Sequence, residues 1–323
     1  MTRPTRRAVL AAPLALAAPA VRAQAAFPSR TVTIVVPYAA GGPTDVIARL
    51  VAEGMARDLG VAVVAENITG AGGTLGGARV AAARPDGHTL LMHHIAMATH
   101  ATIYRRLPYD VERSFAPLGL VSDAAMTIIA RPDFPADDLP ALLRVIRERR
   151  DGLNLAHSGG ANFLCGLLMQ DAAGAEMTPV VFRGSAPAIT EIIAGRIDMM
   201  CDQATNTVPY IRDRRIKVYA MTLERRAEGL DMPTTAEAGA PSIAMSTWHG
   251  LYAPAGTPEE VQLRLNAALR AALREERLRA RFADLVTEVA RPEQLERDHH
   301  RRFLSEEVAR WRPIIQAANA YAD

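Results

Sequence analysis

The sequence predicts an α/β protein of two lobes, each a mostly parallel sheet flanked by helices, with two strands crossing between them. The chain of 323 residues is too long for one ordinary hydrophobic core and suits two domains. Short apolar runs alternate with stretches that carry apolar residues at helical spacing, which is typical of parallel sheets. Turns of small residues follow several of these runs. Because ligands bind at the carboxyl ends of parallel strands, the pattern predicts a cleft between the lobes.

Composition and charge narrow the class further. Apolar residues make up 49% of the chain and aromatic residues 5%, which suits an α/β core rich in Ala, Leu and Val. Removing the four arginines of residues 1–25 changes the formal net charge from +2 to −2. A nearly neutral protein has no general attraction to nucleic acid or to an anionic membrane, so neither is expected as a partner.

Residues 1–25 are predicted to be an export signal that is removed. Arg3, Arg6 and Arg7 form a basic start, residues 8–20 an apolar stretch too short to span a bilayer, and residues 23–25 a small-x-small cleavage site. The adjacent pair Arg6 and Arg7 favours the twin-arginine route, and an ordinary Sec signal is the alternative. The mature protein is therefore expected in the periplasm.

The first lobe is arranged around a turn at residues 37–45, between a predicted strand at 31–36 and a helix at 44–59. Gly41 and Gly42 permit positive φ and a close backbone approach. Thr44 and Asp45 carry short oxygen side chains in the first helical turn, where they can pair with free amides. The remaining amides of such a turn favour an anion, including a carboxylate. The predicted contacts here are Tyr38, Ala39, Ala40, Gly41, Gly42, Thr44 and Asp45.

A second turn and a histidine pair are expected on the same rim. A predicted strand at 61–66 ends in a Gly-rich turn, and a strand at 89–92 ends at His93 and His94. The carboxyl ends of parallel strands meet at one edge of a sheet, so these residues should face the first turn. The contacts predicted from them are Asn67, Gly70, Ala71, Gly72, His93 and His94.

The second lobe is predicted between two crossing segments, an extended one at 115–131 and a strand at 247–253. Strands are expected at 153–156, 178–182, 197–201 and 218–222, and helices at 139–150, 163–173, 188–194 and 207–213. Domain 1 is then discontinuous, residues 26–125 and 250–323, and domain 2 is residues 126–249. A hinge is expected near 118–131 and 245–253. Long helices, the last near 292–318, complete domain 1.

Motifs along the mature chain resemble one family. They are VVPYAAGGPTD (35–45), GAGGTLG (70–76), ARPDGHTLL (83–91), LPYD (107–110), RGSAPA (183–188), GRIDM (195–199) and LYAPAGTP (251–258). Together they resemble the substrate-binding receptors of tripartite tricarboxylate transporters, the Bug-type periplasmic solute-binding proteins. Many motifs at matching spacing are far more specific than one Gly-rich turn.

The resemblance implies a periplasmic-binding-protein (Venus flytrap) fold, a small carboxylate held between the lobes, and a membrane transporter as partner. A monomer without a cofactor or metal is expected. In domain 2 the implied ligand contacts are Ser158, Gly159, Gly160, Asn162, Arg183, Gly184, Ser185, Ala186 and Asp202. The family often has small polar residues where this chain has His93 and His94, and hydroxyls and a His near residues 159–163. The identity of the acid therefore cannot be carried over.

Several residues allow two interpretations. Arg183 could pair with a ligand carboxylate or with a protein acid such as Asp202. Asp202 could accept from a ligand or cap the next segment. His93, His94 and His100 form a poor metal set, so a ligand-facing imidazole is favoured.

The two cysteines and the rival functions remain open at this stage. Cys165 and Cys201 could form a bridge in an oxidising compartment, although two buried thiols are favoured. His157, Ser158 and Asp202 could be assembled into a hydrolase set, but Ser158 lacks the Gly-x-Ser-x-Gly elbow. A sensory or partner-docking protein with the same cleft, not coupled to transport, is the nearer alternative to a transport receptor.

Overall fold

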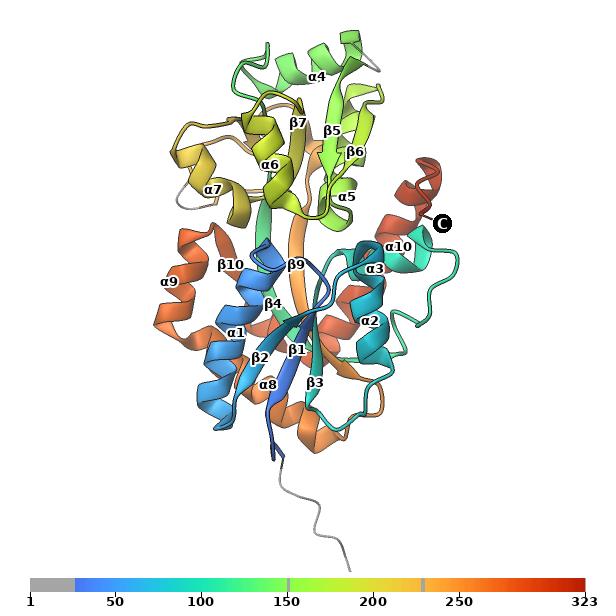
Figure 1. Ribbon diagram of the computed structural model, residues 1–323, viewed down its shortest axis with the longest axis vertical. Helices are drawn as coiled ribbons and strands as arrows, with labels where there is room; N and C mark the ends of the chain where they lie inside the picture. Colours follow the sequence, from blue (N-terminus) through green and yellow to red (C-terminus); the bar gives the residue numbers. More distant parts are fainter. Residues whose placement is uncertain (1–26, 150–151, 228–229, 323) are drawn as a thin grey trace, which may run out of the picture.

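The computed structural model describes residues 27–149, 152–227 and 230–322. They form an upper and a lower lobe joined by two long strands (Figure 1). The predicted export signal, residues 1–25, lies outside the described residues. In the described part of the chain no helix is long and apolar enough to cross a membrane.

Lobe 1, the lower lobe of Figure 1, contains one side of a mixed sheet. β2 (Val63–Asn67), β1 (Val32–Val36) and β3 (Thr89–His94) are parallel neighbours, and β9 (Ser246–Pro254) runs antiparallel between β3 and β4 (Phe115–Ala130). The helices of this lobe are α1 (Pro43–Leu59), α2 (Thr74–Ala81), α3 (Ala96–Ile103), α8 (Glu259–Arg274), α9 (Glu276–Asp284) and α10 (Arg297–Ala317).

The ends and the buried face of α1 follow from its sequence. Pro43 occupies the first helical position, where a missing N–H costs nothing, and Gly60 ends the helix in the left-handed conformation at φ 72°. Ile47, Val51 and Met55 recur at helical spacing and have no exposed surface. This face fixes the direction in which the first turn points.

Lobe 2 carries the other side of the sheet. β7 (Met199–Gln203) pairs with β4 antiparallel and with β5 (Asn154–His157) parallel, and β6 (Thr178–Val181) is the parallel edge strand. β8 (Lys217–Met221) also pairs with β4. The helices of this lobe are α4 (Leu139–Arg149), α5 (Gly160–Ala173), α6 (Ser185–Ile193) and α7 (Ala204–Arg212).

β4 belongs to both lobes. Its residues up to Ala125 pair with β9, while Met126 to Ala130 pair with β7. The prediction of two α/β lobes joined by crossing strands is therefore confirmed. The sheet is mixed because β4 and β9, which run between the lobes, are antiparallel to their neighbours.

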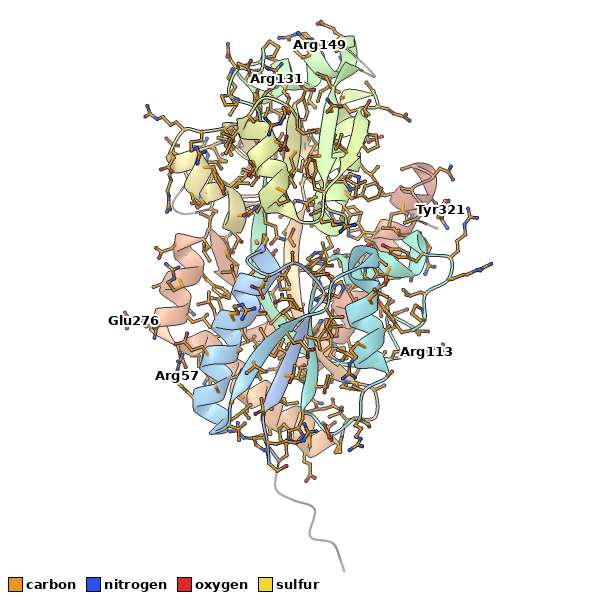
Figure 2. The ribbon with its side chains drawn as sticks, viewed as in Figure 1. Arg57, Arg113, Arg131, Arg149, Glu276 and Tyr321 are labelled. Carbon is orange, nitrogen blue, oxygen red and sulfur yellow. The ribbon has the colours of Figure 1, made fainter. Side chains whose placement is uncertain are left out.

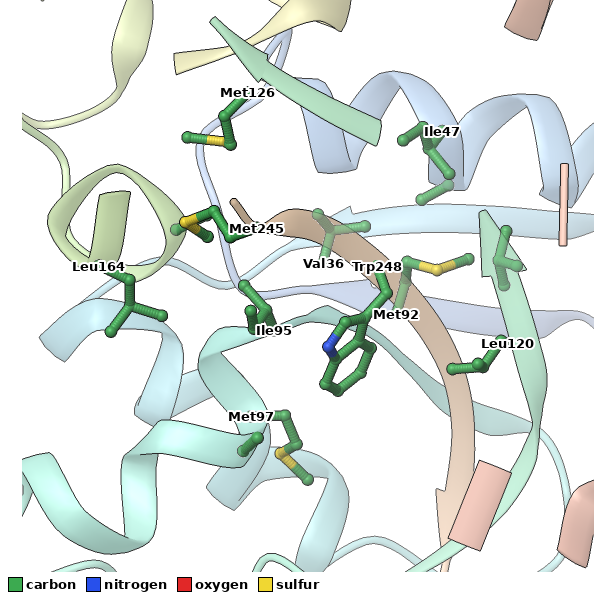
Figure 3. Close-up of a cluster of buried hydrophobic side chains, with 14 of the residues drawn as sticks. Val36, Ile47, Met92, Ile95, Met97, Leu120, Met126, Leu164, Met245 and Trp248 are labelled. Atoms are coloured by element: carbon green, nitrogen blue, oxygen red, sulfur yellow. The ribbon is translucent and has the colours of Figure 1, made fainter. Parts of the chain in front are cut away.

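The main hydrophobic core is continuous through the hinge. One cluster of buried side chains includes β-strand residues of lobe 1, such as Met92, and α5 residues of lobe 2, such as Leu164. Figure 3 shows Leu164, Met245 and Ile95 from different elements of this cluster, with Trp248 of β9 among them. Because the lobes share apolar packing at the hinge, their separation there is limited.

A short segment of lobe 1 also touches lobe 2 beside the hinge. β10 (Thr287–Val289) pairs with β4, and Thr287 Oγ1 lies 2.9 Å from Thr205 Oγ1 of α7. Arg225 of lobe 2 donates to both Glu288 oxygens at 2.9 and 2.7 Å. Val286 joins a lobe 2 hydrophobic cluster despite a φ of 51°. A β-branched residue rarely adopts this conformation, so the packing must offset its strain.

Charged side chains surround both lobes (Figure 2). Arg57 pairs with Glu53 and Glu275 on lobe 1, and Arg131 pairs with Asp133 and Asp198 on lobe 2. Arginines at these positions are neutralised by neighbouring acids. They therefore do not make the concentrated positive surface that nucleic acid requires.

Three sequence-based expectations about elements need correction. Residues 96–103 form a helix that was not expected, in an all-round apolar stretch without clear periodicity. β3 continues through His93 and His94, which were expected after its end. α5, α6 and α7 begin three residues earlier than predicted, at Gly160, Ser185 and Ala204, because small residues mask the helical spacing there.

Candidate functional site

A cleft of about 710 Å³ lies between the lobes. Lobe 1 contributes its first and second turns and His94, and lobe 2 contributes the starts of α5 and α6 and the end of β7. Gly184 and Ala39 approach across it, since a Cβ added to Gly184 would lie 3.5 Å from the Ala39 Cβ. The lobes are therefore in contact across the cleft, and the conformation is closed.

The first turn is organised by Asp45, whose side chain lies behind it. The Gly41 amide donates to Asp45 Oδ2 at 2.8 Å, Arg49 Nε donates to the same oxygen at 2.9 Å, and Asn67 Nδ2 donates to Oδ1 at 2.8 Å. Burial raises the pKa of Asp45, but these hydrogen bonds and the Arg49 charge outweigh it and the pKa lies below the ordinary value. Asp45 therefore stays ionised and fixes the turn.

These bonds leave a smaller set of amides for a ligand than the sequence suggested. The Gly41 amide is bound to Asp45, and the Gly42 amide donates to Ala39 O at 3.2 Å. Among the described residues, the amides of Ala39 and Ala40 have no acceptor. The glycines of the turn shape it. The two alanine amides remain as donors, and so do the amides of Thr44 and Asp45 in the first turn of α1, which also have no acceptor among the described residues.

His94 and Tyr38 form the aromatic side of the lobe 1 wall. Their rings stack with centroids 4.2 Å apart and planes 13° from parallel. The Ala96 amide donates to His94 Nδ1 at 3.0 Å, so in the neutral ring the proton is on Nε2. Burial, and then the neighbouring histidines, hold the pKa of His94 well below its ordinary value. His94 is therefore a neutral donor.

Gly160 of lobe 2 lies against this imidazole. A Cβ at Gly160 would stand 2.6 Å from His94 Cε1, and the residue has a φ of 57°. Both the left-handed backbone and the close approach require glycine. The contact places the start of α5 directly on the lobe 1 wall.

A row of buried histidines supports the wall from behind. His249 of β9 bridges Thr44 Oγ1 at 3.3 Å and Ser122 Oγ at 3.1 Å, and burial lowers its pKa to about 3. Burial lowers the pKa of His93 to about 4. His100 lies 2.8 Å from Tyr109 Oη and 3.2 Å from Gly72 O. These imidazoles are therefore neutral and fill the core rather than carrying charge.

Asp202 has the corresponding position in lobe 2. Its carboxylate accepts hydrogen bonds from Asn162 at 2.7 Å, Ser185 at 3.0 Å and Asn206 at 2.7 Å. These donors lie in the first turns of α5, α6 and α7, where an anion is favoured. Burial raises the pKa of Asp202, and the neutral donors oppose the rise only in part. Asp202 therefore holds together the first turns of three helices. Of the two roles allowed by the sequence, a ligand acceptor or a helix cap, this is the capping role.

Arg183 is the charged residue that faces the cleft. It is exposed and precedes α6, and among the described residues that line the cleft it is the only Asp, Glu, Lys or Arg. No protein carboxylate pairs with it in the described part of the chain. The interpretation in which Arg183 pairs with Asp202 is not realised, because the oxygens of Asp202 are taken by other donors.

The structure brings most of the predicted site residues to one surface. Those that line the cleft are Tyr38, Ala39, Ala40, Gly42, Thr44, Gly70, Ala71, Gly72, His94, Ser158, Gly159, Asn162, Arg183, Gly184, Ser185 and Ala186. Six others lie behind the wall or within the turns, namely Gly41, Asp45, Asn67, His93, Gly160 and Asp202.

Two further lining residues, Thr69 and Gly73, belong to the second turn, which was predicted as part of the wall from Asn67 through Gly73. The sequence interpretation missed six lining residues, namely Pro37, Pro43, Val181, Phe182, Pro187 and Gln203. Gln203 is the last residue of β7, so the rule that strand ends face the ligand could have found it. Val181 is the last residue of β6 and Phe182 follows it, so the same rule could have found both.

The described residues do not form the hydrolase set, the metal site or the disulfide that the sequence left open. Ser158 Oγ donates to Asn162 Oδ1 at 2.7 Å, while His157 Nδ1 accepts from the Gly159 amide at 3.3 Å. Among the described residues no cluster of His, Cys, Asp and Glu is arranged to hold a metal ion. Cys165 and Cys201 are both buried and free.

A closed interlobe cleft between two α/β lobes defines a periplasmic-binding-protein fold. The family model described as "Tripartite tricarboxylate transporter family receptor" matches residues 47–320, and the chain belongs to this family of solute-binding receptors. A UPF0065 protein from the TAR-I ttuE-ttuC' intergenic region of Agrobacterium vitis is 42% identical, over 82% of this chain and 78% of that protein.

Two solved structures are also similar. The periplasmic binding protein BugD matches with a TM-score of 0.87 and 37% identity, covering 92% of this chain and all of that one. MatC from Rhodopseudomonas palustris, with bound malate, matches with a TM-score of 0.86 and 39% identity, covering 90% of this chain and all of that one. These similarities confirm the predicted family and fold.

Proposed function

We propose that the protein is an exported periplasmic receptor that binds a small organic carboxylate in the interlobe cleft and delivers it to a tripartite tricarboxylate-type transporter. The observation that carries this is the charge of the cleft. Free amides of Ala39 and Ala40 on one wall face the exposed Arg183 on the other, and no described acid lines the space between. Such a site favours an anion with acceptors at both ends.

The two walls divide the task. The lobe 1 amides and the neutral His94 Nε2–H are fixed donors for one carboxylate, and they carry no charge that would need a counter-ion. Arg183 supplies the positive charge from lobe 2 and binds a second acidic group in a fork. MatC, which is similar in fold and sequence, has malate bound, and malate has two carboxylates.

Closure is proposed to occur about the crossing strands. The predicted domains, residues 26–125 with 250–323 and residues 126–249, divide near the point where β4 changes partners, between Ala125 and Met126. The hinge is placed at 118–131 and 245–253. The closed form, in which Gly160 touches His94, is the form that a transporter would recognise.

A titration of purified mature protein with mono- and dicarboxylates of three to eight carbons tests the proposal. Calorimetry should give saturable binding without turnover, and Arg183→Met should weaken the best dicarboxylate about tenfold, with less effect on its monocarboxylate analogue. Arg212→Met is the matched control, because Arg212 is exposed on α7 outside the cleft lining. A folded protein that binds no carboxylate, or that converts one to product, would contradict the proposal.

A further inference from the structure

The side chain of Gln203 is a buried polar group whose carbonyl oxygen has no hydrogen-bond partner among the described residues. It is 5% exposed, lines the cleft and ends β7 where α7 begins. The carbonyl oxygen, Oε1, is itself buried. An unpaired buried carbonyl oxygen is costly, so a donor from outside the protein is expected to pair with it.

Nearby polar side chains are already occupied. Asn162 donates to Asp202 and to Cys201 O, and Ser185 also donates to Asp202. Thr207 Oγ1 lies 2.8 Å from Thr127 Oγ1 and 3.4 Å from the Gln203 carbonyl, not from its amide side chain. The partner of the Gln203 carboxamide must therefore come from the cleft.

We propose that Gln203 determines specificity by hydrogen bonding to a hydroxyl group on the bound carboxylate. A hydroxyl both donates and accepts, so it pairs with whichever end of the carboxamide faces the cleft. A carboxylate oxygen pairs with the N–H end alone, and a methylene pairs with neither. The inference rests on the proposed function and names its substrate class, a hydroxy acid, in place of carboxylates in general.

The test compares ligands that differ by one hydroxyl. Calorimetry is performed with succinate against malate, glutarate against 2-hydroxyglutarate, and adipate against 2-hydroxyadipate, and the pair containing the tightest ligand is used. The protein should bind the hydroxylated member about tenfold more tightly. Gln203→Met, which keeps the length of the side chain without its polar atoms, should reduce this ratio to within about twofold, mainly by weakening the hydroxy acid.

Two further variants make the result decisive. Gln316→Met changes a glutamine on the exposed face of α10 and should keep the full ratio. Gln203→Asn keeps the amide but withdraws it by one methylene, and it replaces Gln203→Met if thermal unfolding shows that the latter does not fold. An unchanged ratio in the Gln203 variants, or equal binding of both members by the unaltered protein, would overturn the inference. Absence of binding to every member would contradict the proposed function itself.

Discussion

Each lobe holds one buried carboxylate behind its wall of the cleft, and the two behave in opposite ways. Asp45 is 2% exposed and Asp202 is 1% exposed, and each accepts several hydrogen bonds. The pKa of Asp45 lies below the ordinary value, whereas that of Asp202 lies above it. Two things differ: Arg49 donates to Asp45 and adds its charge, whereas Asp202 has neutral donors and lies deeper in the protein, where burial raises its pKa more. Neutral donors alone do not overcome burial.

The comparison extends to the rest of each wall. Lobe 1 fixes its turn with an ion pair and stacks Tyr38 on a row of neutral imidazoles, which holds its donors in place. Lobe 2 gathers three helix starts on one carboxylate, and within the described part of the chain it leaves the Arg183 guanidinium and the Gln203 carbonyl oxygen without a protein partner. A rigid wall suits the common acid group of many ligands, and free side chains on the other wall suit the group that differs.

Acidification should affect lobe 1 most, and this is the largest effect expected. Burial holds the pKa of five lobe 1 histidines below the ordinary value, to about 4 for His93 and about 3 for His249 and His300; the other two are His94 and His100. Below about pH 6.5 the unfolded chain binds protons that the folded chain does not, so stability falls by about 1.4 kcal/mol per pH unit for each histidine.

Hydrogen exchange and urea unfolding at pH 7.5 and pH 5.5 check this expectation. Amides of β1, β3 and α3 should lose protection before those of β5 and α5, since His157 is the sole described histidine of lobe 2. The raised pKa values of Asp202 and of Asp123, the latter about 6, act in the opposite direction and stabilise the folded state as pH falls. Equal loss of protection in both lobes would remove the distinction drawn between them.

Loss of the Asp202 carboxylate should destabilise lobe 2. Asp202→Ala leaves the buried donors of Asn162 and Ser185 and the half-buried donor of Asn206 without their acceptor, and we expect about 3 kcal/mol lower stability to urea. Asp202→Asn should cost less, because its carbonyl still accepts. Asp213→Ala, at an exposed position after α7, is the control. A cost for Asp202→Ala no larger than that of the control would show that Asp202 does not gather the helix starts.

A methyl group at the contact between the walls should block closure. Gly160→Ala places its Cβ 2.6 Å from His94 Cε1, so ligand affinity measured by calorimetry should fall about 30-fold as the walls separate. Gly174→Ala is matched, since Gly174 has a similar φ of 64° but nothing within 4 Å of an added Cβ. Both should lose about 1 kcal/mol of stability, and only Gly160→Ala should lose affinity. Similar affinities in the two variants would place closure elsewhere.

Removal of the Arg49 charge tests directly why the pKa of Asp45 is lowered and that of Asp202 is raised. It should change the stability less than the other substitutions. Arg49 is half-exposed, so Arg49→Met should cost about 1 kcal/mol or less at neutral pH. Because the pKa of Asp45 is lowered in the folded protein, its carboxylate stabilises the fold at pH values above the pKa it has in the unfolded chain. This stability is lost as the pH falls through the lower pKa of the folded state. In the variant, urea unfolding between pH 3 and 5 should show this loss diminished or reversed. An unchanged pH profile would mean that Arg49 does not control the Asp45 pKa.

The sequence located the walls but not how their bonds are distributed. The Gly-rich turn at 37–45 was recognised because glycines, Pro43 and short oxygen side chains have strong local preferences. Which amides stay free could not be predicted, since the Gly41 amide is taken by Asp45 in a geometry set by Arg49 and by Asn67 from another strand. Likewise the sequence allows Asp202 to be either a ligand acceptor or a cap, because its three donors come from separate helices.

By itself, the sequence determined two α/β lobes, the order of their strands and helices, and the turns at the strand ends. These follow from apolar periodicity and from the backbone freedom of glycine, which act over a few residues. The tertiary structure alone decided that His94 is a neutral donor, that Asp202 lies behind the wall, and that Gln203 and Arg183 line the cleft without pairing with a described acid. Burial, tautomer and pairing depend on groups distant in the chain, and no local pattern records them.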